Sequence, residues 1–246
     1  MISIIVPTLN EEKNISDFFR SLDWQSWRRF EVIIVDGGSK DLTVKKARKY
    51  GAKVIVQPKC PEFLSRNIGA KKAKGDILLF TCADVIFPRN LLKTVHDKFT
   101  EETKLIALSG PGVPIDAPAI GRVEYELYNI FRYLLTKLPC KLKRFSTSTN
   151  FLVVRKNNFI RTCGFHPNDV NADGIMGKRL TEIGEINFSL DTYVHISARR
   201  MKAMGFIEFN KHYLYVLENV FPSLSKTIFI RKLKYKSGNV HGKMHE

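Results

Sequence analysis

The chain has 246 residues, with 40 Lys and Arg against 24 Asp and Glu and a formal net charge of +16. This length suits one large α/β domain or a domain with a small appendage. The positive excess favours phosphates, anionic lipid head groups or nucleic acid as partners and does not choose among them. Four dispersed cysteines without a Cys-x-x-Cys pair argue against a zinc knuckle and a disulfide framework.

Hydropathy gives no sign of a segment that spans a membrane. A span needs about 20 consecutive apolar residues, and Lys or Arg interrupts every candidate stretch. No secretory leader is recognised before Ile2. We therefore expect a cytoplasmic protein, either soluble or held peripherally at the inner face of the cell membrane.

The first half of the chain alternates short β-branched segments with amphipathic ones. Strands are expected at 2–6, 32–35, 53–56, 76–81 and 104–109. Helices are expected from the capping residue Asn10 to about residue 22, and at 41–50, 64–74 and 89–99. This alternation predicts a Rossmann-like α/β fold, in which a mostly parallel sheet lies between layers of helices.

The second half is less regular. A loop rich in Gly and Pro at 110–118 precedes segment 120–138, which is apolar and aromatic around most of its circumference. A core helix is the favoured interpretation of this segment, and the alternatives are the lining of an acceptor groove or contact with a membrane surface. A strand is expected at 150–154, helices at 156–163 and 174–183, and a helix entered from a strand at 194–203.

Three acidic residues stand where these segments end. Asp36 and Asp84 follow two of the expected strands, and Asp173 precedes the helix expected at 174–183. Ligands of open α/β sheets bind beyond the carboxyl ends of the strands. The three acids therefore indicate a site in which carboxylates hold a metal, contact a nucleotide and act as a base.

Four motifs, in this order and spacing, resemble those of glycosyltransferase family 2. They are Pro7-Thr8-Leu9-Asn10-Glu11, the segment 35–43, Arg66-Asn67-Ile68-Gly69 and Cys82-Ala83-Asp84. As a set they are specific in a way that no single motif is. The resemblance covers about residues 1–205 and implies a GT-A fold, a nucleotide-sugar donor, a divalent cation and inversion at the anomeric carbon.

The resemblance also implies a division of the chain. Residues 1–222 are expected to form a GT-A domain, with a nucleotide-sugar-binding half at 1–110 and an acceptor-binding half at 111–222. Residues 223–246 are expected to be a basic tail. A glycan or a lipid-linked molecule is the expected acceptor, and nucleic acid is not an expected partner.

The donor-binding residues implied by the resemblance lie in the four motifs. Asp36 is expected to accept a hydrogen bond from the base of the donor, and its alternative role is to cap the next helix. Arg66 is expected to reach the nucleotide or its diphosphate with a forked guanidinium, and its alternative is a solvated helix charge. The complete set is Pro7, Thr8, Asn10, Glu11, Asp36, Arg66, Cys82, Ala83 and Asp84.

The metal motif departs from the family pattern of Asp-x-Asp, because Cys82 replaces the first acid while Asp84 remains. One carboxylate and the two phosphates of the donor suit Mg²⁺ or Mn²⁺, which prefer oxygen ligands. The Cys82 thiol is expected to pack or to lie beside the ribose. His195 resembles the C-terminal histidine that completes the metal or diphosphate site, and a structural histidine is the alternative.

Asp173 matches the acid that the family uses as a general base, although Ala172 replaces the Glu often found before it. As a base, Asp173 takes the proton of an acceptor hydroxyl during in-line attack. Its alternative role is the N-cap of the following helix. With a phosphate acceptor a base is less necessary, and Asp173 would then position the sugar.

Three further interpretations stay open. The basic residues Lys137, Lys141, Lys143 and Arg144, together with the tail, favour contact with an anionic membrane surface. A nucleotidyltransferase also places acids on such a sheet, but segment 7–10 lacks the glycines of a phosphate-binding loop. A non-enzymatic alternative is a decayed GT-A scaffold that binds nucleotide sugars or polyanions, as the replacements at 82 and 172 and the charge allow.

Overall fold

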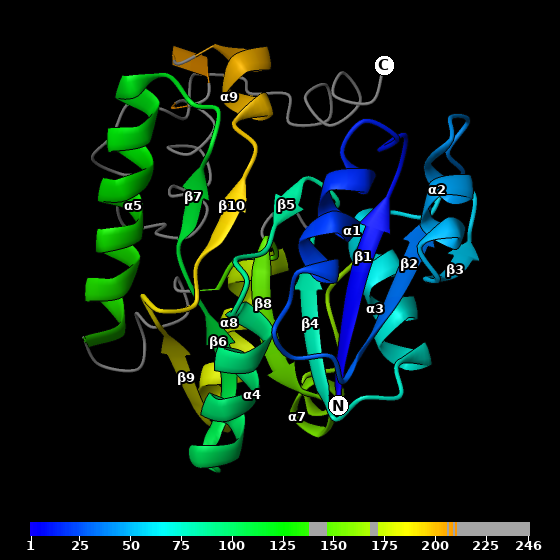
Figure 1. Ribbon diagram of the computed structural model, residues 1–246. Helices are drawn as coiled ribbons and strands as arrows, with labels where there is room; N and C mark the ends of the chain where they lie inside the picture. Colours follow the sequence, from blue (N-terminus) through cyan, green and yellow to red (C-terminus); the bar gives the residue numbers. More distant parts are fainter. Residues whose placement is uncertain (138–146, 168–171, 206, 209, 211–246) are drawn as a thin grey trace.

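The structure is a computed structural model that describes residues 1–137, 147–167, 172–205, 207, 208 and 210. The tail expected at 223–246 lies outside these residues, as do Lys141, Lys143 and Arg144. The described part has α/β architecture, with helices packed on both faces of a central sheet (Figure 1). The predicted fold class is confirmed.

The central sheet has the strand order β3-β2-β1-β4-β8-β6-β9. The strands β3, β2, β1 and β4 pair in parallel, which gives the first half of the sheet the predicted doubly wound form. Their bounds are β1 Ile2–Thr8, β2 Phe30–Asp36, β3 Lys53–Val56, β4 Ile77–Thr81, β6 Leu105–Ser109, β8 Phe151–Arg155 and β9 Glu185–Phe188.

Strand β8 is antiparallel to both of its neighbours, β4 and β6. Thr81, the last residue of β4, lies opposite Phe151, the first residue of β8. The amino end of β8 therefore lies at the same edge of the sheet as the carboxyl ends of β1, β2 and β4. In Figure 1 this edge points upward, with the chain start at the opposite edge.

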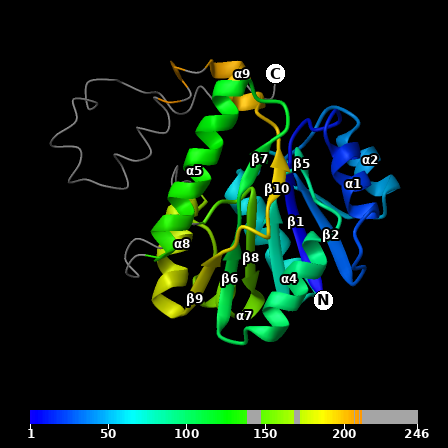
Figure 2. The same ribbon diagram turned by 60° about the vertical axis from the view of Figure 1, so that its left-hand side comes forward.

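The helices form two layers. The described helices are α1 Ile15–Asp23, α2 Thr43–Lys49, α3 Glu62–Lys72, α4 Leu91–Glu101, α5 Ala119–Lys137, α7 Lys156–Arg161, α8 Ala172–Ile183 and α9 Arg199–Met204. Apolar residues of α1, α2 and α4 pack on one face of the sheet, and those of α3, α7 and α8 pack on the other. Figure 2 shows the layers from a second direction.

The strand side chains explain why the sheet needs cover on both faces. All five residues of β4 are buried, with Leu79 in the first apolar cluster and Leu78 and Phe80 in the second. A strand whose successive side chains enter opposite layers reads as a continuous apolar run. Gly69 of α3 lets this helix approach β1, because a Cβ at this position would lie 2.4 Å from a methyl carbon of Ile5.

A second, smaller sheet was not predicted. It contains β5 Val85–Ile86, β10 Val194–Ile196 and β7 Gly112–Pro114, with β10 in the middle. Strand β10 pairs antiparallel with β5, so that Ile196 lies opposite Val85. These strands are two or three residues long. A strand was expected before the helix of 194–203, which agrees with β10, whereas β5 and β7 carry too little periodicity to be recognised in sequence.

Two predictions about helices are corrected. Helix α1 begins at Ile15 and not after Asn10, because residues 12–14 form a turn and the Asn10 side chain accepts a hydrogen bond from Lys40 N instead of capping the helix. Helix α5 is not a core helix. Its buried residues are Gly121, Asn129, Arg132 and Leu135, whereas most of its large aliphatic side chains are exposed.

Candidate active site

Three parallel strands bring the first, second and fourth motifs to one edge of the sheet. Strand β1 lies between β2 and β4, and Thr8 of β1 is directly opposite Asp36 of β2. Cys82, Ala83 and Asp84 follow the last residue of β4. Pro7 belongs to the same strand as Thr8, and Ala83 is buried in the core. This arrangement agrees with the expectation that ligands bind at the carboxyl edge.

The Asp36 carboxylate is completely buried and holds the turn after β2. Its Oδ1 accepts hydrogen bonds from Gly38 N at 3.0 Å and Ser39 N at 2.8 Å. Its Oδ2 accepts from Thr8 Oγ1 at 2.8 Å and Ser39 Oγ at 2.6 Å. Asp36 thus organises its own turn rather than capping α2, and a contact with a donor base stays a prediction that requires one of these hydrogen bonds to be exchanged.

The turn after β1 places Glu11 inside the site. Glu11 N donates to Thr43 Oγ1 at 2.7 Å, and Asn14 Nδ2 donates to Glu11 Oε2 at 2.7 Å. The Glu11 residue is 5% exposed. Asn10 has a positive φ of 53° and donates from its backbone to Ser39 Oγ at 2.8 Å, so the turns after β1 and β2 are tied together.

Arg199 connects two of the predicted site carboxylates. Its NH1 and NH2 atoms donate to Glu11 Oε2 at 3.0 Å and to Glu11 Oε1 at 2.7 Å. Its Nε atom lies 3.0 Å from Asp84 Oδ2. Burial opposes the charge, but the hydrogen bond to Glu11 and the charge of Asp84 raise the pKa of Arg199. A permanent guanidinium charge therefore lies between the Glu11 and Asp84 carboxylates.

The short β10–β5 pairing explains how Arg199 arrives there. Because Ile196 lies opposite Val85, the residues that follow β10 meet the residues that precede β5. Asp116 fixes the start of α9, since its Oδ1 accepts from Ala198 N at 2.6 Å and its Oδ2 pairs with Lys202 Nζ at 2.8 Å. The site therefore includes a residue from the far end of the described chain.

Arg66 lies beneath this edge as a fully buried cation. It is 0% exposed and donates to Thr81 O at 2.9 Å, to Glu62 Oε1 at 2.7 Å and to Cys82 Sγ at 3.3 Å. The alternative of a solvated helix charge is therefore wrong. A direct contact between Arg66 and a nucleotide stays a prediction, and in this structure the guanidinium supports the end of β4.

Cys82 packs against the same cation. Its thiol lies between Arg66 and Asn150 Oδ1, which is 3.6 Å away. Burial raises the pKa of Cys82 to about 12, and the nearby Arg66 only partly opposes this effect. The thiol is thus neutral near pH 7, which agrees with the expected packing role and disfavours binding of a hard metal.

Asp173 lies in the first turn of α8 and faces the amino end of β8. Its Oδ2 accepts from Thr149 N at 3.2 Å and from Thr149 Oγ1 at 3.3 Å, and Thr147 Oγ1 donates to the Asp173 carbonyl at 2.9 Å. The other oxygen, Oδ1, is enclosed and has no hydrogen-bond partner among the described residues. The carboxylate bonds Thr149 and does not cap α8.

Burial raises the pKa of Asp173, although Arg66 and the hydrogen bonds from Thr149 lower it in part. A carboxylate with a raised pKa is a stronger base than an exposed Asp. The influence of Arg66 and Glu62 on Asp173 places all three groups in one electrostatic environment. Within the described part of the chain, Asp173 thus has one oxygen without a hydrogen-bond partner and a raised pKa. Its role as a general base stays a prediction.

His195 belongs to the middle strand of the small sheet. Its ring meets Tyr193 edge-on, with 5.4 Å between the ring centroids, and its Nδ1 atom is buried without a hydrogen-bond partner in the described part of the chain. Across the described ranges no group of three His, Cys, Asp or Glu side chains is placed to hold a metal ion. The role of His195 as a ligand stays a prediction.

The residues at this edge of the sheet offer a divalent cation one candidate carboxylate ligand, Asp84. Asp84 offers the hard oxygen that Mg²⁺ or Mn²⁺ prefers, but it is paired with Arg199. The protein therefore fits such a cation only if phosphate oxygens of the donor supply further ligands. No third protein ligand is required under that condition, because Mg²⁺ is commonly held by one or two carboxylates and substrate phosphates.

Several residues that shape the site carry no motif of their own and were missed. They are Glu62, Thr149 and Asn150. Asn67 lies within a motif, but its role is structural, because it exchanges hydrogen bonds with the backbone of Phe165 at 2.8 and 2.9 Å. Arg199 also lies outside the four motifs, although it connects Glu11 and Asp84. No local signal marks such residues, since their partners lie far away in the sequence.

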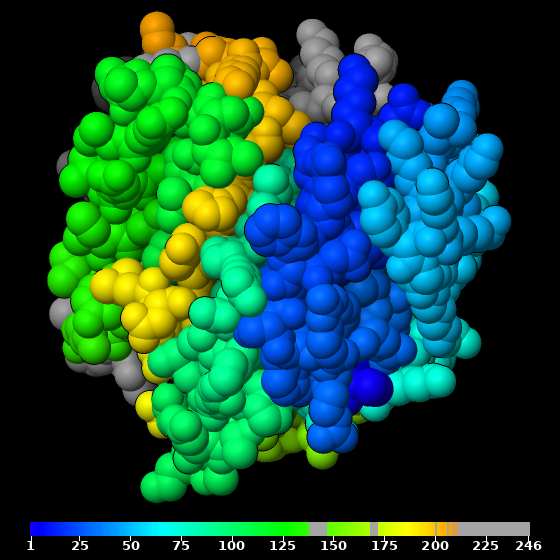
Figure 3. All heavy atoms as spheres, viewed as in Figure 1, coloured from blue at the N-terminus to red at the C-terminus, as the bar shows by residue number. Residues whose placement is uncertain are grey.

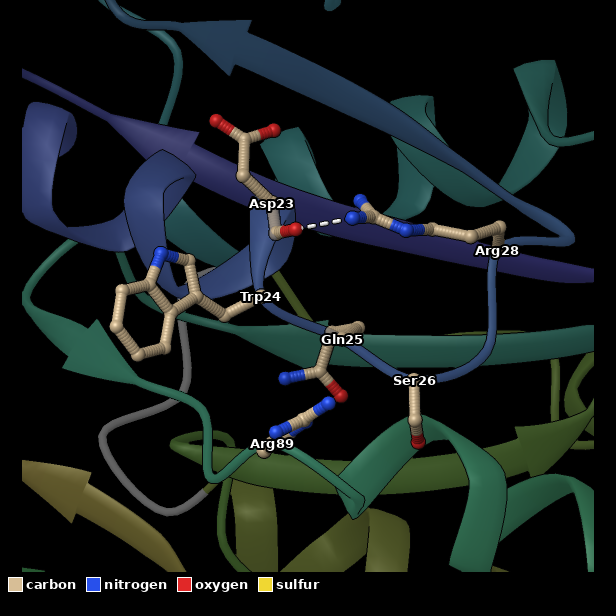
Figure 4. Close-up of a pocket in the computed structure, with 6 residues that line it drawn as sticks. All are labelled: Asp23, Trp24, Gln25, Ser26, Arg28 and Arg89. Carbon is tan, nitrogen blue, oxygen red and sulfur yellow. Dashed lines mark hydrogen bonds between the residues drawn. The ribbon is translucent and has the colours of Figure 1, made fainter.

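A hollow of about 320 Å³ lies away from this edge (Figure 4). Trp24, Gln25 and Arg28 line it in the segment between α1 and β2, which is the end of β2 opposite Asp36. Gln25 closes one side by donating to Pro88 O at 2.8 Å. The hollow contains none of the predicted site residues, so the candidate site rests on the hydrogen-bond network at the strand ends.

Solved structures define the class of fold. The chain superposes on the mannosyltransferase PcManGT from Pyrobaculum calidifontis, solved with GDP-Man and Mn²⁺, with a TM-score of 0.69 and 18% identity over 90% of this chain and 64% of that one. It superposes on residues 1–349 of TarS from Staphylococcus aureus with a TM-score of 0.65 and 20% identity, covering 89% and 65%. The fold is that of the GT-A glycosyltransferases.

Residues 3–159 match the model of the family described as Glycosyl transferase family 2. The chain belongs to this family. Its relatives include the S. aureus poly(ribitol-phosphate) beta-N-acetylglucosaminyltransferase TarS, which is 31% identical over 58% of this chain and 27% of TarS. Another is the Pyrococcus furiosus dolichol-phosphate mannosyltransferase, 30% identical over 55% and 38%. The chain thus spans about a quarter to two fifths of these relatives.

Proposed function

We propose that the protein is an inverting glycosyltransferase that moves a hexose from a nucleotide sugar to a hydroxyl or lipid-phosphate acceptor. The observation that carries this proposal is the convergence of motif residues from three segments, in which Arg199 joins Glu11 and Asp84. The solved relatives support a nucleotide-sugar donor, because TarS was crystallised with UDP and with UDP-GlcNAc. The carrier, the sugar and the acceptor are left open by these neighbours, which differ among themselves.

In this proposal Asp173 is the general base for a hydroxyl acceptor. Its carboxylate removes the proton from the acceptor oxygen as that oxygen bonds to the anomeric carbon, and the bond from this carbon to the diphosphate oxygen breaks. Attack opposite the leaving group inverts the configuration. The raised pKa of Asp173 favours proton transfer, and Thr149 orients the carboxylate through Oδ2. Its Oδ1 atom is enclosed in this structure, so the acceptor has to displace the groups around Oδ1 to reach it.

Asp84 is the residue proposed to hold Mg²⁺ or Mn²⁺ together with the donor, and His195 is the other predicted ligand. The ion supplies positive charge to the departing diphosphate. Glu11, Asp36 and the turns after β1 and β2 line the donor site. Arg199 would compete with the ion for Asp84, since its Nε atom lies 3.0 Å from Asp84 Oδ2.

A panel of UDP, GDP and dTDP sugars tests the proposal. Wild-type protein with Mn²⁺ is expected to hydrolyse at least one donor slowly, with release of the nucleoside diphosphate. The Asp84→Ala variant should lose roughly a hundredfold of this activity, the usual scale for removing one electrostatic stabiliser. Asp191→Ala is the matched control, because the Asp191 side chain is 77% exposed and its ion pair with Lys98 is long, at 3.7 Å.

The panel also separates the decayed scaffold from the enzyme. Replacement of the first motif acid by Cys82 is the observation that favours a decayed scaffold. A thermal shift with a nucleotide sugar but no turnover under any condition would support a binding protein. The absence of both turnover and a thermal shift would overturn the glycosyltransferase proposal.

A further inference from the structure

Asn150 lies against the segment that leads to the proposed metal ligand. It precedes β8, whose first residue, Phe151, lies opposite Thr81 at the end of β4. The Asn150 carbonyl accepts from Thr81 Oγ1 at 2.8 Å, and the Cys82 thiol donates to Asn150 Oδ1 across 3.6 Å. Both the backbone and the side chain of Asn150 are thus held beside the turn that carries Asp84.

The residue before Asn150 holds the proposed base. Thr149 donates from N and from Oγ1 to Asp173 Oδ2, at 3.2 and 3.3 Å, and is itself 7% exposed. Thr147 Oγ1 donates to the Asp173 carbonyl at 2.9 Å. Two successive residues just before β8 therefore join the two halves of the candidate site. Thr149 contacts the base, and Asn150 contacts the metal-binding segment.

The contact with Cys82 decides which way the Asn150 carboxamide points. The sulfur accepts from Arg66 at 3.3 Å, and its own S–H group donates to Asn150 Oδ1. With Oδ1 turned to the thiol, the two N–H groups of Nδ2 lie on the other side of the carboxamide. Nδ2 makes no hydrogen bond with the described residues, and it is not an enclosed atom of this half-buried residue. The N–H groups are therefore available to a ligand.

The transferred sugar lies between these two halves in the proposed reaction. Its anomeric carbon is bonded to the diphosphate on the Asp84 side and is attacked on the opposite face by the oxygen that Asp173 deprotonates. Asn150 is attached to the segment on the first side and follows the residue that holds the second. Its Nδ2 donors match the hydroxyl oxygens of a hexose, which accept hydrogen bonds.

The carboxyl edge of the sheet is the side from which a ligand meets Asn150. Figure 1 shows the amino end of β8 at this upper edge, beside the end of β4. In Figure 3 the helices α1 and α4 and the strand β10 fill the front of the molecule. A sugar attached to a nucleotide at the strand ends therefore approaches Asn150 from the edge and not through this face.

We infer that Asn150 binds the transferred hexose, with the carboxamide Nδ2 donating to a hydroxyl oxygen of the sugar. The residue supplies no proton and no net charge to the reaction, and it fixes the ring between the diphosphate and Asp173. This inference rests on the proposed function, because the roles given there to Asp84 and Asp173 place the sugar. It adds a sugar contact that lies outside the four motifs.

A comparison of a nucleotide sugar with its nucleoside diphosphate tests the inference. The UDP, GDP or dTDP sugar that shifts the melting temperature of wild-type protein in the donor panel is titrated into the full chain with Mn²⁺ by isothermal titration calorimetry. The matching diphosphate without the sugar is titrated in the same way. Asn150→Ala should weaken binding of the nucleotide sugar by about three- to tenfold, the usual worth of one neutral hydrogen bond. The affinity for the diphosphate should change by less than about twofold, because this ligand lacks the sugar.

The matched control is Asn157→Ala, because Asn157 is exposed on α7, which follows the opposite end of β8. This variant should leave both affinities unchanged. Asn150→Ala is expected to fold, since its backbone bond with Thr81 remains, and Asn150→Ser gives the same comparison if the alanine variant unfolds.

The pattern of losses separates the possible outcomes. Equal weakening of both ligands by the Asn150 variants, or no weakening of either, would overturn the inference and leave the proposed function intact. A wild-type protein that binds no nucleotide sugar would overturn the proposed function and this inference with it. Weaker binding of the nucleotide sugar alone supports the sugar contact, because a merely structural role of Asn150 would not distinguish the two ligands.

Discussion

Arg199 Nε lies 3.0 Å from Asp84 Oδ2, and the same guanidinium holds both carboxylate oxygens of Glu11. The two carboxylates at the mouth of the candidate site are therefore neutralised in part by a cation of the protein itself. Arg199 is separated from Asp84 by 115 residues, and only the pairing of β10 with β5 brings them together. Without a donor, Arg199, Glu11 and Asp84 therefore form one ion-pair network. A cation that binds Asp84 must compete with the Arg199 guanidinium.

Arg199→Gln is expected to strengthen the binding of Mn²⁺ to the donor-free protein. Removing the guanidinium takes away the positive charge that Arg199 places beside Asp84 and Glu11, so a divalent ion no longer competes with it. A charge-assisted contact worth about 1.4 kcal/mol corresponds to a gain of roughly tenfold in affinity. Mn²⁺ titration followed by electron paramagnetic resonance measures the effect. Lys202→Gln at the neighbouring Asp116 pair serves as the control, and unchanged Mn²⁺ affinity in Arg199→Gln would contradict the argument.

Asp173→Asn is expected to keep donor binding and to lose transfer to a hydroxyl acceptor by about 100-fold to 10,000-fold, the range for removal of a general base. The amide preserves the shape of the side chain but cannot accept the proton. Donor-dependent thermal shift and product formation measure the two properties separately. Equal loss of donor binding and transfer would reject the base assignment.

The same variant has a predicted pH signature. Burial raises the pKa of Asp173 in the folded protein, so the folded state binds this proton more tightly than the unfolded state. Stability therefore falls as the pH rises from the ordinary pKa of Asp through the raised one. Asp173→Asn should raise the melting temperature at pH 7, and this gain should vanish below the ordinary pKa of Asp. A gain that is constant across pH would contradict the assigned pKa direction.

The Cys82 thiol is expected to resist alkylation in the native protein. Its pKa is raised to about 12, mainly by burial, and the thiolate is the reactive form. Cys163 is exposed and should react with iodoacetamide at pH 8. Mass spectrometry of peptides after timed alkylation compares the two sites. Modification of Cys82 at the rate of Cys163 would show that the buried cluster with Arg66 is open in solution.

Arg66→Met is expected to lower the free energy of unfolding by about 2–3 kcal/mol, because Thr81 O and Cys82 lose a buried charged donor. The methionine keeps much of the volume, so the effect reports the polar contacts. Arg20→Met is the control, since the Arg20 side chain is 68% exposed and its loss should change stability by less than about 0.5 kcal/mol. Urea unfolding followed by circular dichroism measures both, and equal stability of the two variants would contradict the supporting role of Arg66.

Local patterns predicted most of the helices and strands in residues 1–110. The β-branched runs and the turns after them identified β1, β2, β3 and β4, and the positions of Asp36 and Asp84 at strand ends followed directly. The start of α1 was wrong because Asn10 is a good helix cap in isolation. In the fold its side chain bonds the turn after β2 instead, and a tertiary partner of this kind leaves no local signal.

Local patterns could not predict the direction of strand β8 or the pairing of the three strands of the small sheet. The apolar run of β8 predicts a strand but not its direction, because both directions bury the same side chains. The direction nevertheless decides that Asn150 stands beside Cys82 and that Thr149 meets Asp173. Helix α5 shows the same limit. Its composition suggested a core helix, whereas the polar contacts of Asn129 and Arg132 turned its apolar face outward.

The amino-acid sequence by itself determined the α/β class, the family motifs and the order of the carboxylates along the chain, because these depend on hydrophobic period and turn chemistry within about 20 residues. Only the tertiary structure decided that Arg199 lies between Glu11 and Asp84, that Arg66 is buried beneath them and that most large aliphatic side chains of α5 face solvent. These relations depend on strand pairing and packing between distant segments. A local sequence pattern does not show which distant segments pack together, because the free energy of such contacts depends on the whole fold.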